Sequence, residues 1–174
     1  ATNGGAVSAF SAYAAGWRGG ISSGVSADYD GDGRADPAMY GEAVGAWRIM
    51  PSAYGYRKQV YDFNRLGGRG WASMSADFDG DGRADPAVYQ ELTGTWCALF
   101  SSSNYNYLAT LAFPFGGAGW SGVAADFDGD GWADPGIYGR ASGDWQVCLS
   151  TLNYAPQARP AFLGGPGAWP VAGD

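Results

Sequence analysis

The sequence of 174 residues contains no histidine, only two cysteines and few basic side chains. Without histidine, Ser-His-Asp and Cys-His catalysis and any zinc or haem site that uses imidazole are excluded. Lysine and arginine number 10 against 17 aspartates and glutamates, and the pI is near 4.3. A nucleic-acid partner is therefore not expected, because phosphate binding depends on basic patches.

Long apolar segments are also missing. No run approaches the roughly 18 residues of a membrane-spanning helix, so no membrane partner is expected. The first residue is Ala1, which suggests a processed or excised piece. What is abundant is glycine, with 30 residues, and aromatic side chains, at 16%. This composition predicts an all-β domain of short strands joined by tight turns.

Twelve of the acids fall in three copies of a nine-residue segment, here called the first, second and third aspartate loops. They are DYDGDGRAD (Asp28–Asp36), DFDGDGRAD (Asp77–Asp85) and DFDGDGWAD (Asp126–Asp134), and successive copies begin 49 residues apart. Flanking residues keep the same spacing, so the sequence is a repeat of 49-residue units. The aligned series are Pro37, Pro86, Pro135; Tyr40, Tyr89, Tyr138; Gly45, Gly94, Gly143; Trp47, Trp96, Trp145; Tyr56, Tyr105, Tyr154; and Trp71, Trp120, Trp169.

Each unit contains four segments with strand character. In the second unit they are Trp71–Ala76, Pro86–Gln90, Thr95–Ser101 and about Tyr107–Phe113. Four antiparallel strands covered on both faces predict a blade of a β-propeller. A row of independent β-modules is the weaker alternative, because so short a unit makes a poor core alone and no linker separates the units.

The length gives an incomplete number of blades. We expect half a blade over 1–21, full blades over about 22–70, 71–119 and 120–168, and a terminal strand over 169–174, all within a single repeat domain. About three and a half blades per chain leave open sheet edges. A homodimer that closes one seven-bladed ring is therefore predicted, and a fragment of a longer chain is the alternative.

The aspartate loops predict three Ca²⁺ sites per chain. Carboxylates recur at loop positions 1, 3, 5 and 9, with a backbone carbonyl at position 7, and hard oxygen donors in this number favour Ca²⁺ over Mg²⁺. A metal-free cluster of Asx turns is disfavoured, because four close carboxylates repel one another. We expect the ions to stabilise the fold and not to act as a signal. The expected ligands are Asp28, Asp30, Asp32, Arg34, Asp36, Asp77, Asp79, Asp81, Arg83, Asp85, Asp126, Asp128, Asp130, Trp132 and Asp134, with Arg34, Arg83 and Trp132 contributing their carbonyls.

The spacing D-x-D-G-D-G-x-x-D-P, followed by A-x-Y and G-x-W strands, resembles the FG-GAP/VCBS-type repeats of bacterial extracellular proteins. Integrin α-subunit propellers and a fungal lectin with a seven-bladed ring are similar at greater distance. The resemblance covers nearly the whole chain. It implies a propeller with Ca²⁺ loops between the first two strands of each blade, an extracellular location and a binding or adhesive role. Asp174 matches only the first position of a fourth loop, so no ion is assigned there.

Catalysis is not expected. Only five acids remain outside the loops: Glu42, Asp62, Glu91, Asp144 and Asp174. Glu42 and Glu91 are equivalent positions on separate units, so a close pair of the kind a glycosidase needs is not expected. The chain is instead interpreted as a non-catalytic binding module.

Its ligand is predicted to be a glycan or a protein. Trp71, Trp120 and Trp169 lie beside glycines and could stack on sugar rings, as in a lectin, although plugging the gaps between blades is the favoured role of these indoles. The Tyr56, Tyr105 and Tyr154 series has the same two interpretations. A protein-interaction scaffold and a purely structural or engineered propeller fragment are the alternatives.

Cys97 and Cys148 lie one and three residues after equivalent tryptophans, so they point to the same side of equivalent strands. Neighbouring blades contact each other through opposite faces, so these side chains should not meet. Two buried free thiols are predicted.

Overall fold

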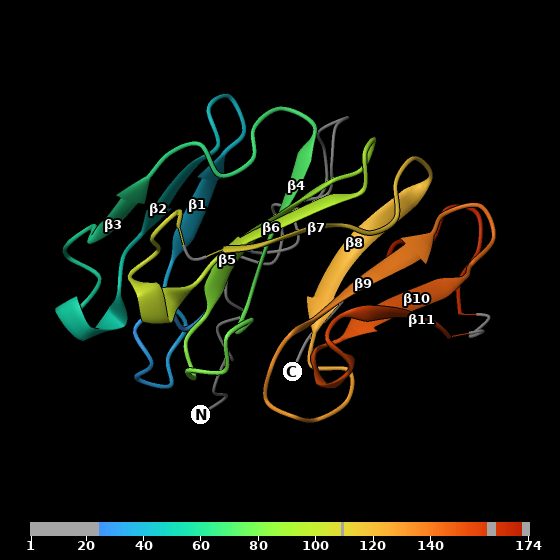
Figure 1. Ribbon diagram of the computed structural model, residues 1–174. Helices are drawn as coiled ribbons and strands as arrows, with labels where there is room; N and C mark the ends of the chain where they lie inside the picture. The colour runs from blue at the N-terminus through green and yellow to red at the C-terminus, as the bar shows by residue number, and fades with distance from the viewer. Residues whose placement is uncertain (1–24, 109, 160–162, 172–174) are drawn as a thin grey trace, which may run out of the picture.

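The computed structural model describes residues 25–108, 110–159 and 163–171, and its strands form three antiparallel sheets (Figure 1). In the first unit the order is β1-β2-β3, in the second β4-β5-β6-β7, and in the third β8-β9-β10-β11. The strands are β1 (Ala38–Gly41), β2 (Ala46–Ile49), β3 (Tyr61–Phe63), β4 (Trp71–Ala76), β5 (Asp85–Gln90), β6 (Thr95–Leu99), β7 (Thr110–Pro114), β8 (Trp120–Ala125), β9 (Asp134–Gly139), β10 (Trp145–Leu149) and β11 (Ala155–Arg159). The all-β class and the antiparallel strands predicted from the sequence are confirmed.

Among the described residues, helix is limited to three short 3-10 turns, η1 (Ser52–Tyr54), η2 (Ser101–Ser103) and η3 (Ser150–Leu152). Each follows the third segment of its unit and ends at a residue in the left-handed conformation. Within the described ranges, no helix has the length and apolar character needed to cross a membrane.

The strand pairing repeats with the sequence. Ala76 pairs with Asp85 where β4 meets β5, and Ala125 pairs with Asp134 where β8 meets β9. In the first unit an isolated bridge joins Ala27 to Asp36 at the equivalent position. The same register therefore closes every aspartate loop.

Two strand boundaries differ from the prediction by more than one residue in the second unit. β6 ends at Leu99 instead of Ser101, because the Ser101 N–H donates to the Asp85 carboxylate and starts η2. β7 begins at Thr110 instead of Tyr107, because Tyr105 has a positive φ and the Asn106 side chain accepts from the Leu108 N–H, which extends the turn. The half blade expected over 1–21 lies outside the described residues. Of the terminal strand expected over 169–174, residues 169–171 form no strand and the rest lie outside the described residues.

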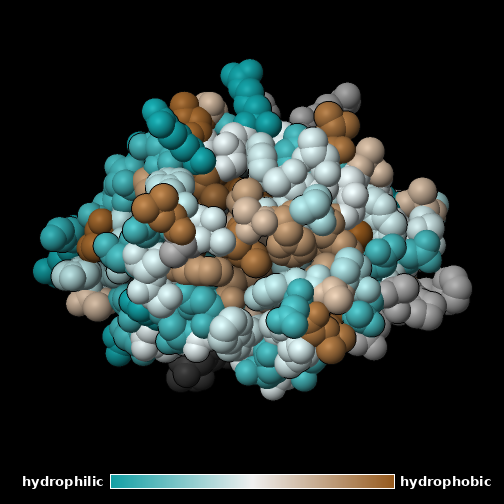
Figure 2. Space-filling model, in the orientation of Figure 1, coloured by the Kyte–Doolittle hydropathy of each residue, from teal (hydrophilic) through white to brown (hydrophobic). Residues whose placement is uncertain are grey.

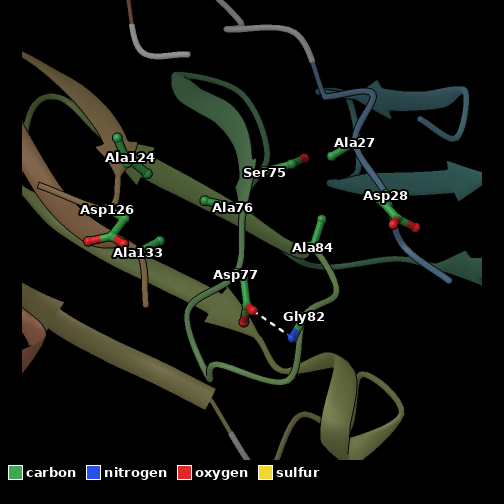
Figure 3. A pocket seen from close by; sticks show the side chains of 11 residues that line it. Ala27, Asp28, Ser75, Ala76, Asp77, Gly82, Ala84, Ala124, Asp126 and Ala133 are labelled. Atoms are coloured by element: carbon green, nitrogen blue, oxygen red, sulfur yellow. Dashed lines mark hydrogen bonds between the residues drawn. The ribbon is translucent and has the colours of Figure 1, made fainter. Parts of the chain in front are cut away.

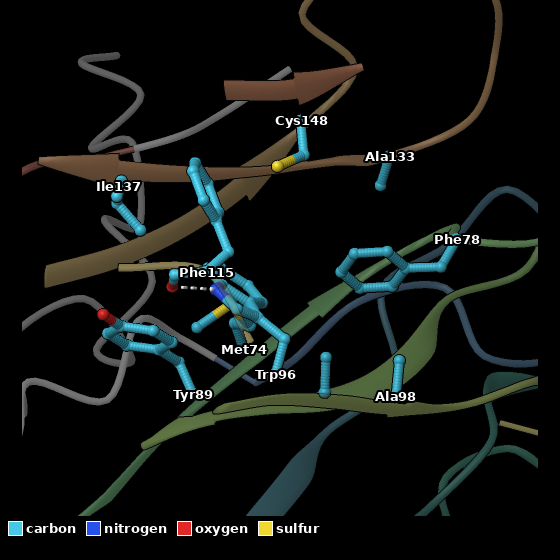
Figure 4. Close-up of a cluster of buried hydrophobic side chains, with 10 residues drawn as sticks. Met74, Phe78, Tyr89, Trp96, Ala98, Phe115, Ala133, Ile137 and Cys148 are labelled. Atoms are coloured by element: carbon cyan, nitrogen blue, oxygen red, sulfur yellow. Dashed lines mark hydrogen bonds between the residues drawn. The ribbon is translucent and has the colours of Figure 1, made fainter. Parts of the chain in front are cut away.

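The hydrophobic core lies between neighbouring sheets. Between the second and third units, Met74, Trp96 and Ala98 pack against Ile137 and Cys148 (Figure 4). A matching cluster joins the first and second units and includes Tyr29, Trp47, Ile49, Val88 and Tyr105. Figure 2 shows further apolar side chains gathered across the middle of one face of the molecule. Each sheet therefore depends on its neighbours for burial, as expected for repeat units too small to fold alone.

Both cysteines are free, as predicted. Cys97 packs in the cluster between the first and second units, and Cys148 in the cluster between the second and third. Cys148 is buried, whereas Cys97 is only half-buried, so the predicted burial is wrong in part for Cys97.

Candidate metal centres

In the second and third units the aspartate loop connects β4 to β5 and β8 to β9, and in the first unit it lies between Ala27, which forms an isolated bridge with Asp36, and β1. The carboxylates of Asp77, Asp79 and Asp85 gather in the second loop, with ligand atoms within 4.8 Å of one another. The first loop gathers Asp28, Asp30 and Asp32 in the same way, and the third gathers Asp126, Asp128 and Asp134. Three of the four predicted aspartates thus come together in each loop, and Asp36, Asp81 and Asp130 stand outside these groups.

The first aspartate of each loop organises the backbone. The Asp77 carboxylate accepts hydrogen bonds of 2.7 Å from the N–H groups of Gly80 and Gly82, the second of which is drawn in Figure 3. Both glycines have positive φ, which side chains with a Cβ rarely adopt. Asp28 and Asp126 receive the equivalent bonds in their own loops. The glycines therefore give the loop the sharp curl predicted from the sequence.

The last aspartate of each loop is buried between the loop and the 3-10 turn. Asp85 accepts 2.8 Å and 2.6 Å hydrogen bonds from the N–H groups of Phe78 and Ser101. Asp36 and Asp134 make the same pair of bonds. Burial raises the pKa of Asp85 to about 7 and also raises the pKa values of Asp36 and Asp134. A nearby cation would offset this cost of ionisation.

The remaining carboxylates accept hydrogen bonds from the 3-10 turn, a contact that the sequence interpretation missed. The Ser101 hydroxyl donates to Asp81 at 2.8 Å, and the Ser102 hydroxyl donates to Asp79 at 2.5 Å. Ser52 and Ser150 repeat the Ser101 contact on Asp32 and Asp130. The signal was available, because Ser52, Ser101 and Ser150 follow the same 49-residue spacing.

The donor set of the second loop fits a divalent cation. Its ligands are carboxylate oxygens, which hard cations prefer. One of them, Asp79 Oδ1, is buried and has no hydrogen-bond partner among the described residues. A buried carboxylate oxygen without a partner is costly, and a cation at this point would satisfy it. The three groups can therefore hold metal ions, and their geometry alone does not specify which ion.

In the second and third loops, the side chain at position 7 lies against the preceding loop. A Cβ placed on Gly31 would meet the Arg83 side chain at 3.0 Å, and one placed on Gly80 would meet the Trp132 ring at 2.1 Å. Arg83 also forms a 2.6 Å ion pair with Asp81. Arg34, in the first loop, is largely exposed and lies 3.8 Å from Asp32.

Backbone hydrogen bonds link successive loops. The Ala84 N–H donates to the carbonyl oxygen of Asp28 at 2.7 Å, and the Ala133 N–H donates to that of Asp77 at 2.5 Å. Two metal groups in neighbouring loops are thus joined by one peptide-to-peptide contact. A change in the backbone conformation of one loop is therefore expected to shift the loop that is hydrogen-bonded to it.

The segments that lead into the three aspartate loops end around one cavity of about 280 Å³, at Ala27 in the first unit and at the ends of β4 and β8 in the other two, as shown in Figure 3. Asp28, Asp77 and Asp126 line it together with small side chains such as Ala76 and Ala124. β4 and β8 also contact each other directly. β4 and β8 are therefore the innermost strands of the second and third units, and the aspartate loops open from one end of this inner group.

The tryptophans considered for ligand binding differ in their surroundings. Trp71 and Trp120 are half-buried and pack against the two hydrophobic clusters. Trp169 is 49% exposed, and the Arg140 guanidinium lies 5.7 Å from its ring centre. Arg140 also pairs with Glu91 at 2.7 Å, which links the second and third units.

The tyrosine series contacts the loops. The hydroxyl of Tyr105 reaches the Tyr29 carbonyl oxygen in the first loop, and that of Tyr154 reaches the Phe78 carbonyl oxygen in the second. Tyr105 is buried, which favours packing between units over ligand binding at this position.

No protein-family model matches this chain, and a search of curated proteins finds no significant match.

Proposed function

We propose that this chain is a section of a β-propeller held together by Ca²⁺ and that it acts as a non-catalytic extracellular binding or adhesion module. The observation that carries the proposal is that each of the three loops brings three aspartates together with ligand atoms within 4.8 Å of one another, from positions 1, 3 and 5 in the first loop and from positions 1, 3 and 9 in the second and third. A single acidic cluster would be weak support. Three equivalent ones, linked by backbone hydrogen bonds, favour a common ligand at all three loops.

Ca²⁺ is the proposed ion at all three loops because its coordination is flexible and uses many oxygen donors. The carboxylates of each loop would hold it, together with the carbonyls of Arg34, Arg83 and Trp132 expected from the motif. The ion would favour the ionised form of the buried Asp85 carboxylate, which burial disfavours. Three divalent ions would also offset most of the formal charge of -7.

The propeller itself is supported by the position of the inner strands. β4 and β8 contact each other, and the corresponding ends in all three units surround one cavity. Sheets arranged in this way around a common axis are typical of propeller blades. We further propose that two chains close one seven-bladed ring, which would cover the sheet edges left at the ends of the array.

The metal proposal is tested by calorimetric titration of the chelator-treated protein with Ca²⁺ and, separately, with Mg²⁺. We expect tight binding of Ca²⁺ only and a higher melting temperature in its presence. Asp79→Asn removes a charge from the second loop and should eliminate one of three binding events. Asp144→Asn, at an exposed position, is the charge-matched control. Failure of Ca²⁺ to bind, or an unchanged melting temperature after EGTA treatment, would reject the structural role.

The non-catalytic assignment is supported by the remaining acids. Glu91 is paired with Arg140, and Asp62 lies 3.8 Å from Arg48. The extracellular location follows from the motif resemblance alone and is tested by detecting the protein in culture medium.

A glycan ligand is the second candidate, and the exposure of Trp169 favours it. This indole lines a groove with Pro170 and Val171, so one of its faces could meet a sugar ring. A glycan array probed with the Ca²⁺-loaded protein tests this directly. Binding that disappears in Trp169→Ala would support a lectin, and an array without signal would leave protein adhesion or a purely structural role.

A further inference from the structure

We propose that the two ends of the unit array are complementary surfaces and that a second copy of this chain docks on them head to tail. The head surface is formed by Arg34, Ala35, Met39 and Tyr56 of the first unit. The tail surface is formed by Asp126, Phe127, Gly129, Trp145 and Leu163 of the third. The inference rests on the proposed propeller but differs from its seven-bladed closure, because a first unit placed directly on a third unit gives two copies a ring of six units.

The head surface exposes residues whose repeat equivalents are buried. Val88 in the second unit and Ile137 in the third are 0% and 1% exposed, because each faces the preceding unit. Met39 holds the same position in the first unit and is 62% exposed. Tyr56 is likewise 46% exposed, against 6% for Tyr105. An apolar surface of this kind normally has a partner.

The tail surface exposes a residue at loop position 2 that is buried in the other two units. Tyr29 and Phe78, at position 2 of the first and second loops, are covered by the next unit and are 0% and 1% exposed. Phe127 holds this position in the third loop and is 42% exposed. It borders an apolar groove of about 510 Å³ that Tyr138, Trp145 and Leu163 also line. The groove is the place where a fourth unit would pack.

Two kinds of contact already present between units show what the docked copy would form. Inside the chain, the position-8 N–H of one loop donates to the position-1 carbonyl of the preceding loop, and the unit's tyrosine donates to the position-2 carbonyl. Between copies, the equivalent donors are the Ala35 N–H and the Tyr56 hydroxyl. Their acceptors are the carbonyl oxygens of Asp126 and Phe127.

Charge also favours a second copy as the occupant. Arg83 lies against Gly31, so the basic side chain at position 7 rests on the acidic loop before it. Arg34 is the equivalent side chain on the head surface and is 73% exposed. Docked, it would lie beside Gly129 in the third loop, which carries Asp126 and Asp128. The head surface is therefore already shaped and charged for the tail, because the same pair of surfaces packs twice within one chain.

The experiment is sedimentation velocity of the Ca²⁺-loaded protein from low to high micromolar concentration. We expect a mass of about twice 18.1 kDa for the unchanged chain. Met39→Glu on the head and Phe127→Glu on the tail should each give monomers. Leu163→Glu is a second tail variant at a 69% exposed position, and Leu92→Glu, at 73%, is the control that should remain a dimer.

Mixing the two monomeric variants distinguishes head-to-tail docking from other dimers. Met39→Glu keeps an intact tail and Phe127→Glu keeps an intact head, so an equimolar mixture should form a pair through one interface. A monomeric unchanged chain, variants that remain dimers, or a mixture that stays monomeric would overturn the proposal. Ca²⁺ titration of the folded Met39→Glu and Leu163→Glu monomers separates the two proposals: retained binding leaves the metal function standing when docking fails.

Discussion

The hydroxyl of Tyr105 donates a 3.3 Å hydrogen bond to the carbonyl oxygen of Tyr29, which lies 76 residues earlier in the chain. Tyr154 repeats the contact on Phe78, also across 76 residues. One unit thus fixes the backbone of its neighbour's aspartate loop. The same hydrogen bonds therefore contribute to the stability of the contact between units and to the geometry of the aspartate loops.

Removing this hydroxyl should weaken the contact between the first two units. Tyr105→Phe is expected to lower the free energy of unfolding by about 0.5–1.5 kcal/mol, because a buried hydrogen bond is lost while the ring remains. Urea denaturation followed by tryptophan fluorescence measures the change. Tyr54→Phe, at a 52% exposed position, should have little effect, and equal losses in the two variants would contradict the assignment.

The buried carboxylate of Asp85 should contribute to stability even without metal. Asp85→Ala leaves the N–H groups of Phe78 and Ser101 without their acceptor, so a loss of about 2 kcal/mol or more is expected. Denaturation in EGTA separates this from any metal effect. Asp144→Ala removes the same charge from an exposed position and should be nearly neutral; if Asp85→Ala is also neutral, these hydrogen bonds are not stabilising.

Two equivalent glycines provide a matched test of a close backbone approach. Gly94 and Gly143 both have positive φ, but an added Cβ would meet the backbone of Gly116 at 2.7 Å in the first case and that of Gly164 at 3.5 Å in the second. Gly143→Ala should therefore cost about 1–2 kcal/mol from φ alone.

Gly94→Ala should cost about 1–3 kcal/mol more than this, because the neighbouring backbone must also move. Thermal unfolding of both variants under the same conditions gives the difference. Equal melting temperatures would show that the backbone around Gly116 yields without strain.

The thiols should be unreactive in the folded protein. Burial raises the pKa of Cys148 to about 12, with a smaller contribution from Asp134, and burial also raises the pKa of Cys97. Near pH 8.5, where an ordinary thiol is about half ionised, both should remain protonated and react slowly with a thiol reagent. Cys148 should be the slower, since it is buried. Guanidinium should release two fast-reacting thiols, and fewer than two would indicate a disulfide.

The strand order and the loops could be predicted because the same pattern occurs in three aligned units, and each unit supports the same assignment. Trp71–Ala76 was located correctly as a strand, since its position is fixed by the aromatic series and by the loop that follows. The outer strands were less predictable. β7 pairs with β6 and β11 pairs with β10, which are equivalent strands. Trp96 nevertheless pairs with Phe113, 17 residues later, whereas Trp145 pairs with Arg159, 14 residues later. The connection to the outer strand therefore differs in length between the units, although the units themselves keep the 49-residue spacing.

The sequence by itself determined the all-β class, the 49-residue unit and the aspartates that can hold metal, because these depend on local spacing and on backbone freedom at glycine. Only the tertiary structure decided which carboxylates converge, that serines of the 3-10 turns bind them, and that Tyr105 belongs to the core. These features arise from contacts between segments that are distant along the chain. Burial and partner choice depend on what the neighbouring unit covers, and a repeat leaves the same residue buried inside the array and exposed at its end.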